Sequence, residues 1–230
     1  LEAVMDLIAR GYLNVKALTT HRFPFDRALD AYGLIREAKE PFVGIVLEYD
    51  TDKPQEPVVR LKPEAIRHDP KQELGVGFVG AGNYAALHLL PHLQKDARVK
   101  LQGLVTATGL NAQQKADKFG FAYCTTELKP VLEDESVDAV FIGTRHSTHA
   151  DFTVQALRAG KHVFVEKPMV VSEEQLEAVQ IAYEAANAKC PTALMVGLNR
   201  RFAPMVADLK AALGPGAKQM IYRVNSGHIP

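Results

Sequence analysis

The stretch that decides the fold is residues 75–85, which read GVGFVGAGNYA in a chain of 230 residues. An apolar run leads into Gly-X-Gly-X-X-Ala, and a helical pattern follows directly. Gly80 permits a tight turn, Gly82 lets main-chain amides approach a pyrophosphate, and the small Ala85 lets the helix pack close to the strand. Glycine-rich turns also serve structural roles and occur in methyltransferases, but this one opens a series of strand–helix units. The motif therefore favours dinucleotide binding, with amides of the helix N-terminus facing the phosphates.

Short apolar runs alternate with helical patterns along the rest of this region. Strands are expected at residues 74–80, 99–105, 137–142, 162–165 and 193–198, and helices at residues 84–93, 111–119, 148–159, 173–188 and 201–213. Asn111 and Ser172 stand at N-cap positions. Gly120 and Gly160 follow helix ends, where glycine is common. Because near-continuous apolar strands are typical of a parallel sheet covered on both faces, the predicted fold class is α/β, a Rossmann-type doubly wound parallel sheet.

The first 50 residues follow a different pattern. Helices are expected at residues 2–10 and 25–35, with an extended segment at 15–20 and a strand at 41–47, which predicts a short α/β segment. Residues 48–70 then carry four prolines and few adjacent large apolar side chains, as a linker does. We expect four parts: an N-terminal segment at 1–50, a linker at 51–72, a dinucleotide-binding domain at 73–191 and the start of a C-terminal α+β domain at 192–230, with a strand at 218–224.

Composition argues against several classes of partner. Lys plus Arg equals Asp plus Glu at 27 each, and no basic run provides the positive surface on which nucleic-acid binding depends. No apolar stretch approaches the roughly 20 residues that span a bilayer, so we expect no membrane segment and a cytoplasmic protein. Cys124 and Cys190 lack the paired Cys or His spacing of a zinc site, and no metal is expected.

The end of the strand at residues 99–105 bears on the choice of cofactor. An Asp or Glu that binds the ribose of NAD is expected about 20 residues after the glycines, yet no acidic residue lies between Asp96 and Asp117. The strand ends in Thr106-Ala107-Thr108-Gly109 instead. Hydroxyls there can bond a ribose 2′-hydroxyl or a 2′-phosphate, and a plain polar turn is an equal alternative. The expected cofactor is therefore NAD or NADP.

Two further loops follow strand ends, on the side of the predicted sheet where ligands bind. The first holds Thr144-Arg145-His146-Ser147-Thr148-His149, and the second holds Glu166-Lys167-Pro168. On these residues alone, the two histidines favour the start of a helix, and the second loop favours a polar turn that closes a buried strand.

In these loops and around them the chain resembles the Gfo/Idh/MocA oxidoreductases, named for glucose-fructose oxidoreductase and inositol dehydrogenase. The likeness covers about residues 73–230 and rests on residues 79–82, 143–144 with His149, 156–168 and 197–204. The resemblance implies NAD(P)-dependent hydride transfer at a carbinol carbon of a sugar, cyclitol or nucleotide sugar. It makes Lys167 the catalytic residue beside the reacting hydroxyl, and it assigns Asn199 and Arg200 to the substrate cleft.

The glycine turn, the strand ends and this resemblance together predict a set of cofactor-binding residues. They are Gly80, Gly82, Asn83, Tyr84, Thr106, Thr144, Arg145, His146, His149, Glu166 and Pro168. The family usually has Thr-Pro-Asn at the positions of residues 144–146, and its catalytic acid and histidine would lie beyond Pro230. We therefore expect a fragment that is inactive alone, from a parent that forms homo-oligomers. A non-catalytic NAD(P)-binding or redox-sensing module is the alternative, which retention of Lys167 disfavours.

Residues 1–50 are similar to the carboxyl end of a medium-chain, alcohol-dehydrogenase-like protein. The similarity rests on residues 6–11, 20–24, 28–32 and 44–49. It implies a fusion of two oxidoreductases, with the zinc ligands and the nucleotide site of the first one upstream. A private N-terminal extension is the alternative.

Overall fold

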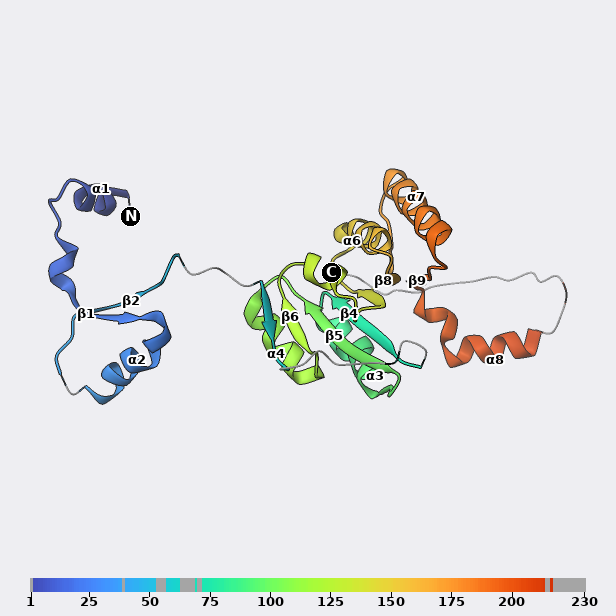
Figure 1. Ribbon diagram of the computed structural model, residues 1–230, viewed down its shortest axis with the longest axis horizontal. Coiled ribbons are helices and arrows are strands. Elements are labelled where there is room, and N and C mark those ends of the chain that lie inside the picture. The colour runs from blue at the N-terminus through green and yellow to red at the C-terminus, as the bar shows by residue number, and fades with distance from the viewer. Residues whose placement is uncertain are drawn as a thin grey trace, which may run out of the picture. The chain divides into compact units, whose positions relative to one another are not determined.

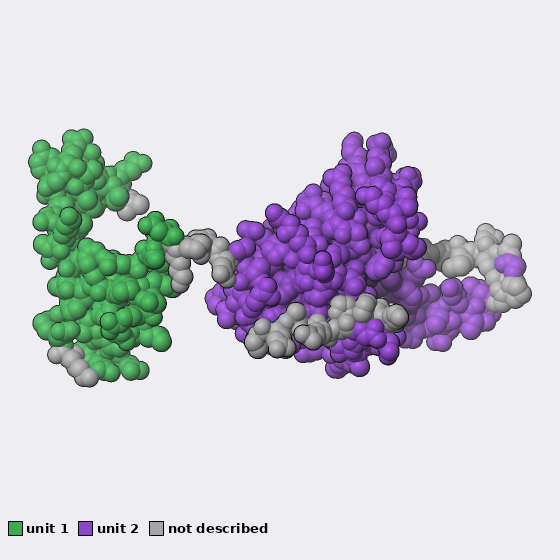
Figure 2. Space-filling view, viewed as in Figure 1, with its two compact units in different colours: residues 1–56 green, residues 57–230 purple. Residues whose placement is uncertain are grey.

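The computed structural model describes residues 2–38, 40–52, 57–62, 69, 72–213 and 216. The chain forms two compact units, which we call unit 1 (Leu1–Glu56) and unit 2 (Pro57–Pro230). Figure 2 distinguishes them by colour. The predicted strand at residues 218–224 and the predicted helix end at Gly214 lie outside the described residues.

Unit 2 is built on a seven-stranded sheet with the strand order β3-β6-β5-β4-β7-β8-β9 (Figure 1). The strands are β3 (Val58–Arg60), β4 (Leu74–Val79), β5 (Val99–Val105), β6 (Tyr123–Thr125), β7 (Ala139–Ile142), β8 (His162–Glu166) and β9 (Leu194–Gly197). Only β3 pairs antiparallel, with β6 at the sheet edge, and the other six strands run parallel. Their order is the 3-2-1-4-5-6 order of dinucleotide-binding sheets. The predicted Rossmann-type fold is confirmed.

Helices connect these strands and bury both faces of the sheet. They are η3 (Ala85–Leu89, a π-helical turn), α3 (Leu90–Lys95), α4 (Gly109–Phe119), α5 (Lys129–Glu133), α6 (His146–Arg158) and α7 (Glu173–Lys189). Two further elements, η4 (Asn199–Phe202, a 3₁₀ turn) and α8 (Pro204–Leu213), follow β9 and contain no buried residue. Phe78 packs in one core cluster with side chains of α3 and α4, whereas Val79 packs in the other with side chains of α6 and α7. Successive side chains of a strand point to opposite faces, so β4 contributes to both clusters.

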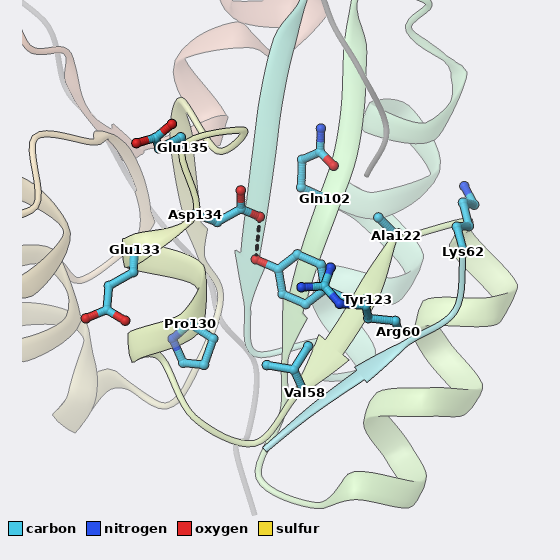
Figure 3. A pocket seen from close by; sticks show the side chains of 10 residues that line it. All are labelled: Val58, Arg60, Lys62, Gln102, Ala122, Tyr123, Pro130, Glu133, Asp134 and Glu135. Carbon is cyan, nitrogen blue, oxygen red and sulfur yellow. Dashed lines mark hydrogen bonds between the residues drawn. The ribbon is translucent and has the colours of Figure 1, made fainter. Parts of the chain in front are cut away.

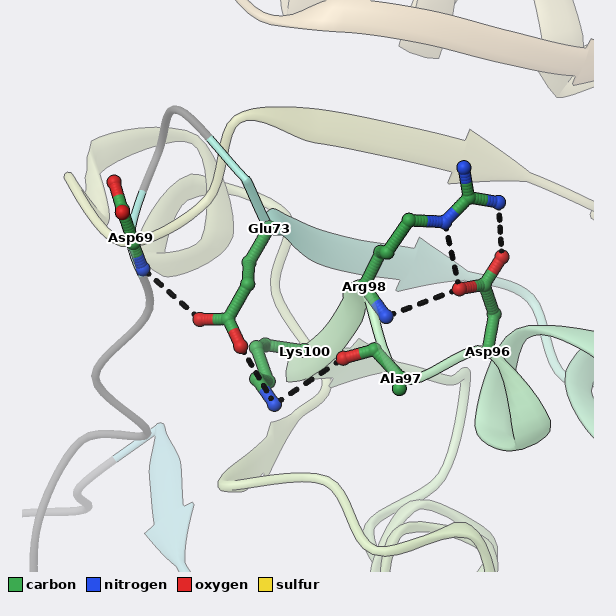
Figure 4. Close-up of polar contacts among 6 residues, drawn as sticks. All are labelled: Asp69, Glu73, Asp96, Ala97, Arg98 and Lys100. Carbon is green, nitrogen blue, oxygen red and sulfur yellow. Dashed lines mark hydrogen bonds and ion pairs between the residues drawn. The ribbon is translucent and has the colours of Figure 1, made fainter.

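Polar contacts fix the amino ends of β4 and β5 (Figure 4). The amide of Leu74 donates to the carbonyl of Arg98 at 2.7 Å, and Lys100 pairs with Glu73 at 3.0 Å. The Arg98 guanidinium donates to both carboxylate oxygens of Asp96, and these hydrogen bonds lower the pKa of Asp96 to about 2. The Leu74–Arg98 and Lys100–Glu73 contacts join the amino ends of the central strand pair that leads into the glycine turn, whereas the Asp96–Arg98 pair holds the turn before β5.

Two edges of unit 2 differ from the sequence prediction. β3 falls within the stretch expected to be a linker, yet it pairs with β6, and the Leu61 amide donates to the Ala122 carbonyl at 2.9 Å. β9 falls within the expected second domain, yet it pairs with β8 and completes the parallel sheet. Both strands join the sheet through main-chain hydrogen bonds, which side-chain periodicity does not reveal.

Within unit 2, β6 and α5 were not predicted, because elements of three and five residues are too short to display a period. The N-cap prediction is right for Ser172, whose hydroxyl accepts from the Gln175 amide at 3.3 Å. It is wrong for Asn111, because α4 begins at Gly109 and the Asn111 side chain instead donates to the Thr108 hydroxyl.

Unit 1 holds a two-stranded parallel sheet, β1 (Thr19–Pro24) with β2 (Gly44–Glu48). Its helices and turns are α1 (Glu2–Ala9), η1 (Val15–Leu18), η2 (Phe25–Arg27) and α2 (Ala28–Glu37). The segment predicted to be extended at residues 15–20 is a 3₁₀ turn up to Leu18, and the strand begins only at Thr19. In the described part of unit 1, Ala31 is the one buried hydrophobic residue.

Candidate functional site

The glycine turn lies at the carboxyl end of β4, between the strands on either side of it. Gly80 has a φ of +88°, and its amide donates to the Val105 carbonyl at 2.9 Å. A Cβ at Gly80 would lie 2.5 Å from Cγ2 of Thr144 and 2.9 Å from the main chain of Gly143. Both the dihedral angle and the space therefore require glycine here.

The next positions of the turn leave room for a ligand. A Cβ built at Gly82 would meet nothing within 4 Å, so this side of the turn is open. The helix begins at once, with the Ala86 amide donating to the Gly82 carbonyl at 2.9 Å, and the amides that precede it have no acceptor within the helix. Ala85 is buried against Gly143. An open glycine turn beside unsatisfied helix amides fits a pyrophosphate.

The carboxyl end of β5 presents hydroxyl groups to the same region. The Thr106 hydroxyl donates to the Thr108 carbonyl at 2.9 Å, and the Thr108 hydroxyl accepts from the Asn111 side chain at 2.8 Å. These bonds form the polar turn that the sequence also allowed. Each hydroxyl oxygen still has acceptor or donor capacity for a ribose or phosphate.

His149 connects the two remaining loops of the site. Its ring is buried, with Nδ1 2.8 Å from the Pro168 carbonyl and Nε2 3.1 Å from the Thr144 carbonyl. The imidazole thus links the loop after β7 to the turn after β8, and neither ring nitrogen faces solvent. Arg145 and His146, predicted in the same loop, are exposed at the start of α6.

The turn after β8 carries an exposed lysine above a buried carboxylate. Glu166 is 7% exposed, and one carboxylate oxygen accepts from the Lys167 amide at 3.3 Å, while the following Lys167–Pro168 peptide bond is cis. Gly197 lies opposite Glu166 in the sheet, and a Cβ there would come within 2.9 Å of Oε1 of Glu166. The sequence alone does not indicate this role of Gly197, since only the β8–β9 pairing reveals it.

Lys167 lies at a cleft of about 570 Å³ that also contains Leu198, Asn199, Arg200 and Arg201. The Asn199 side chain donates to the Tyr84 hydroxyl at 2.9 Å, which links this cleft to the helix after the glycine turn. The structure therefore gathers Lys167, Asn199 and Arg200, which the sequence assigned to substrate, and brings Tyr84 beside them.

A second cavity, of about 420 Å³, lies beside β3, α5 and the amino end of β6 (Figure 3). It is lined by Val58, Arg60, Lys62, Gln102, Ala122, Tyr123, Pro130, Glu133, Asp134 and Glu135. The Tyr123 hydroxyl donates to Asp134 at 2.8 Å across it. Ligands of open α/β sheets bind at the carboxyl ends of the strands, so this cavity is not the candidate site.

The described residues contain neither a cluster of metal ligands nor a membrane-spanning helix. No group of three or more His, Cys, Asp or Glu side chains there could hold a metal ion. No helix in the same described ranges is long and apolar enough to cross a membrane.

Comparison with known proteins identifies what this arrangement resembles. The family model GFO_IDH_MocA, an oxidoreductase family with an NAD-binding Rossmann fold, matches residues 74–197. The chain is 37% identical over 105 residues to scyllo-inositol 2-dehydrogenase (NAD(+)) of Bacillus subtilis (strain 168), which covers 46% of this chain and 30% of that protein.

Two solved structures have the same fold. A 3-ketoreductase from Actinomadura kijaniata in complex with NADP has a TM-score of 0.56 at 25% identity, covering 61% of this chain and 44% of that one. Levoglucosan dehydrogenase in complex with NADH and levoglucosan has a TM-score of 0.54 at 28% identity, covering 62% and 39%. The chain thus spans less than half the length of each of these three proteins.

Proposed function

The chain belongs to the GFO_IDH_MocA oxidoreductase family, and from this premise we propose that it serves hydride transfer between NAD(P) and a carbinol carbon of a sugar-like substrate. The substrate class is a sugar, a cyclitol or a nucleotide sugar. Relatives named for inositol and levoglucosan support this choice. The observation that carries the proposal is the cleft in which Lys167 meets Asn199 and Arg200, beside the helix that follows the glycine turn.

Each part of the site has its own task in this proposal. The open turn at Gly82 and the helix amides after it hold the pyrophosphate. Lys167 donates a hydrogen bond to the reacting oxygen and helps it lose or regain its proton. Asn199 and Arg200 orient neighbouring hydroxyls of the substrate. When bound, the nicotinamide supplies or accepts the hydride.

Supporting residues hold these groups in place. His149 braces the turn after β8, and the Glu166 carboxylate caps the Lys167 amide, so the lysine leaves the sheet in a fixed direction. Arg145, His146 and Thr144 remain proposed cofactor contacts of the loop after β7. The exposed position of Arg145 and His146 is compatible with contact to a bound dinucleotide.

The test replaces Lys167 by Ala and measures dinucleotide affinity and turnover separately. Affinity is measured on this chain, and turnover on a protein in which the chain continues into a substrate domain. Because the lysine acts on the reacting oxygen, we expect turnover to fall about 10²–10⁴-fold while dinucleotide affinity stays close to wild type. Lys129→Ala, at an exposed lysine of α5, is the matched control. Near-wild-type turnover of Lys167→Ala would contradict the proposed role.

Narrower proposals concern the rest of the chain. We propose that residues 1–50 derive from the carboxyl end of a medium-chain dehydrogenase, that residues 73–191 act as the cofactor domain, and that the parent protein is a cytoplasmic homo-oligomer. The family match begins only at residue 74, so the proposal for residues 1–50 rests on the sequence motifs alone. Mass photometry of the parent protein tests the oligomer.

A further inference from the structure

The ribose end of the site contains a cation that has no assigned role. Lys115 lies in the second turn of α4, and its ammonium donates to the main-chain carbonyl of Ala81, between the two glycines of the turn. Helix side chains lean toward the helix N-terminus, so this lysine extends from α4 back toward the loop that holds the cofactor phosphates. The side chain is half-buried, and its ammonium has two further N–H groups after this bond.

The surroundings of this ammonium distinguish the two cofactors. A dinucleotide site selective for NAD places a carboxylate at the end of the second strand, where it binds the ribose 2′-hydroxyl and repels a 2′-phosphate. Here that place is taken by Thr106 and Thr108, and no acidic residue occurs from position 97 to position 116. The hydroxyl of Thr108 accepts from Asn111 and so can direct its own proton to a phosphate oxygen.

We propose that Lys115 binds the 2′-phosphate of NADP(H), together with the hydroxyls of Thr106 and Thr108, and that it determines the cofactor preference of the site. This inference rests on the proposed function. The phosphate adds between one and two negative charges beside an ammonium, at the N-terminal end of α4, where the helix dipole also favours an anion. NADH lacks this group and gains little from Lys115. The chain therefore binds NADPH at least as tightly as NADH.

The experiment is a calorimetric titration of NADPH, NADH, 2′,5′-ADP and 5′-AMP into the full chain. Loss of a hydrogen bond to a charged group predicts that Lys115→Met weakens NADPH and 2′,5′-ADP about ten- to hundredfold. The same change leaves NADH and 5′-AMP nearly unaltered. Lys118→Met, on the same helix with its ammonium over the Phe119 ring, is the matched control and leaves all four affinities unaltered. Lys115→Arg retains the charge and restores the preference for NADPH.

The outcomes separate this inference from the proposed function. If Lys115→Met weakens NADH and NADPH equally, or neither, the lysine holds the glycine turn only and the inference is wrong. A wild-type preference for NADH over NADPH would also overturn it, even if Lys115→Met proved unstable. If the wild-type chain binds no dinucleotide at all, the proposed function fails and the inference fails with it.

Discussion

Unit 1 and unit 2 are both built from parallel strands and amphipathic helices, but they differ in how much of their hydrophobic surface they bury. In unit 2, Phe78 and Leu104 are fully buried in the sheet, and helices cover both of its faces. In unit 1, Leu29 is 84% exposed and Tyr12 is 79% exposed, although both belong to or follow helices. Similar patterns of apolar residues along the sequence therefore bury different amounts of hydrophobic surface in the two units.

The difference follows from the number of layers rather than from the residues themselves. β4 has a strand on each side and a layer of helices on each face, so every side chain along it meets others. In the described part of unit 1, the β1–β2 pair has no third strand, and two strands alone are at best marginally stable in water. A helix or strand pattern indicates which face is apolar. It does not supply the second layer that must cover that face.

The largest expected effect is on the cooperativity of unfolding, when the two units are produced as separate pieces. Unit 2 contains both core clusters, so residues 57–230 alone should unfold in one cooperative transition. Residues 1–56 alone should lose their circular dichroism gradually on heating, because burial of Ala31 cannot offset the entropy of ordering the segment. Thermal melts of the two pieces test this. A sharp transition of the isolated piece 1–56 would show that unit 1 has a core of its own.

Two side-chain substitutions, one in each unit, should show the same difference in burial within the intact chain. Phe78→Ala removes a fully buried ring between β4 and α3, and we expect it to lower the free energy of unfolding by about 3–5 kcal/mol. Leu29→Ala removes a side chain that is mostly in water, and we expect a change within about 0.5 kcal/mol. Urea titration measures the free energy of unfolding of both variants. Equal losses of this free energy would contradict the difference in burial between the two units.

How far the sequence predicts the structure also differs between regions. The strand–turn–helix at residues 74–93 was predicted closely, because its glycines, its apolar run and its helical pattern all indicate one structure. β6 and β3 were missed, since three residues carry no period and their place in the sheet depends on pairing across distant segments.

The same limit applies to the site. Lys167, Asn199 and Arg200 were identified from the family resemblance, and the structure brings them to one cleft. The contacts of His149 with two loops, of Gly197 with Glu166, and of Lys115 with the glycine turn were not predicted. The contacts His149–Pro168, Gly197–Glu166 and Lys115–Ala81 join segments far apart in sequence, and no local pattern encodes such a contact.

Two glycines of one turn should respond in opposite ways to valine. Gly80→Val places a β-branched side chain at a φ of +88° and against the Gly143 main chain, and we expect a loss of about 3 kcal/mol in unfolding free energy. Gly82→Val has free space for its Cβ, so stability should stay near wild type. Its side chain would occupy the space for the pyrophosphate, and dinucleotide binding should disappear. Unchanged NADH affinity in folded Gly82→Val would contradict the placement of the phosphates.

The smallest effect concerns one buried tyrosine of unit 2 and its dependence on pH. Burial, reinforced by the hydrogen bond to Asp134, raises the pKa of Tyr123 above its ordinary value. The unfolded chain then releases the phenol proton above about pH 10, whereas the folded chain retains it, so stability falls as pH rises beyond that point, by about 1.4 kcal/mol per pH unit.

Tyr123→Phe should cost about 1 kcal/mol at pH 7, through the lost hydrogen bond, and should remove this alkaline slope. Tyr32→Phe, at a tyrosine of unit 1 that is 66% exposed, is the control and should leave the slope intact. Urea titrations from pH 7 to pH 11 compare the three proteins, and an unaltered slope in Tyr123→Phe would mean that another group causes the alkaline loss.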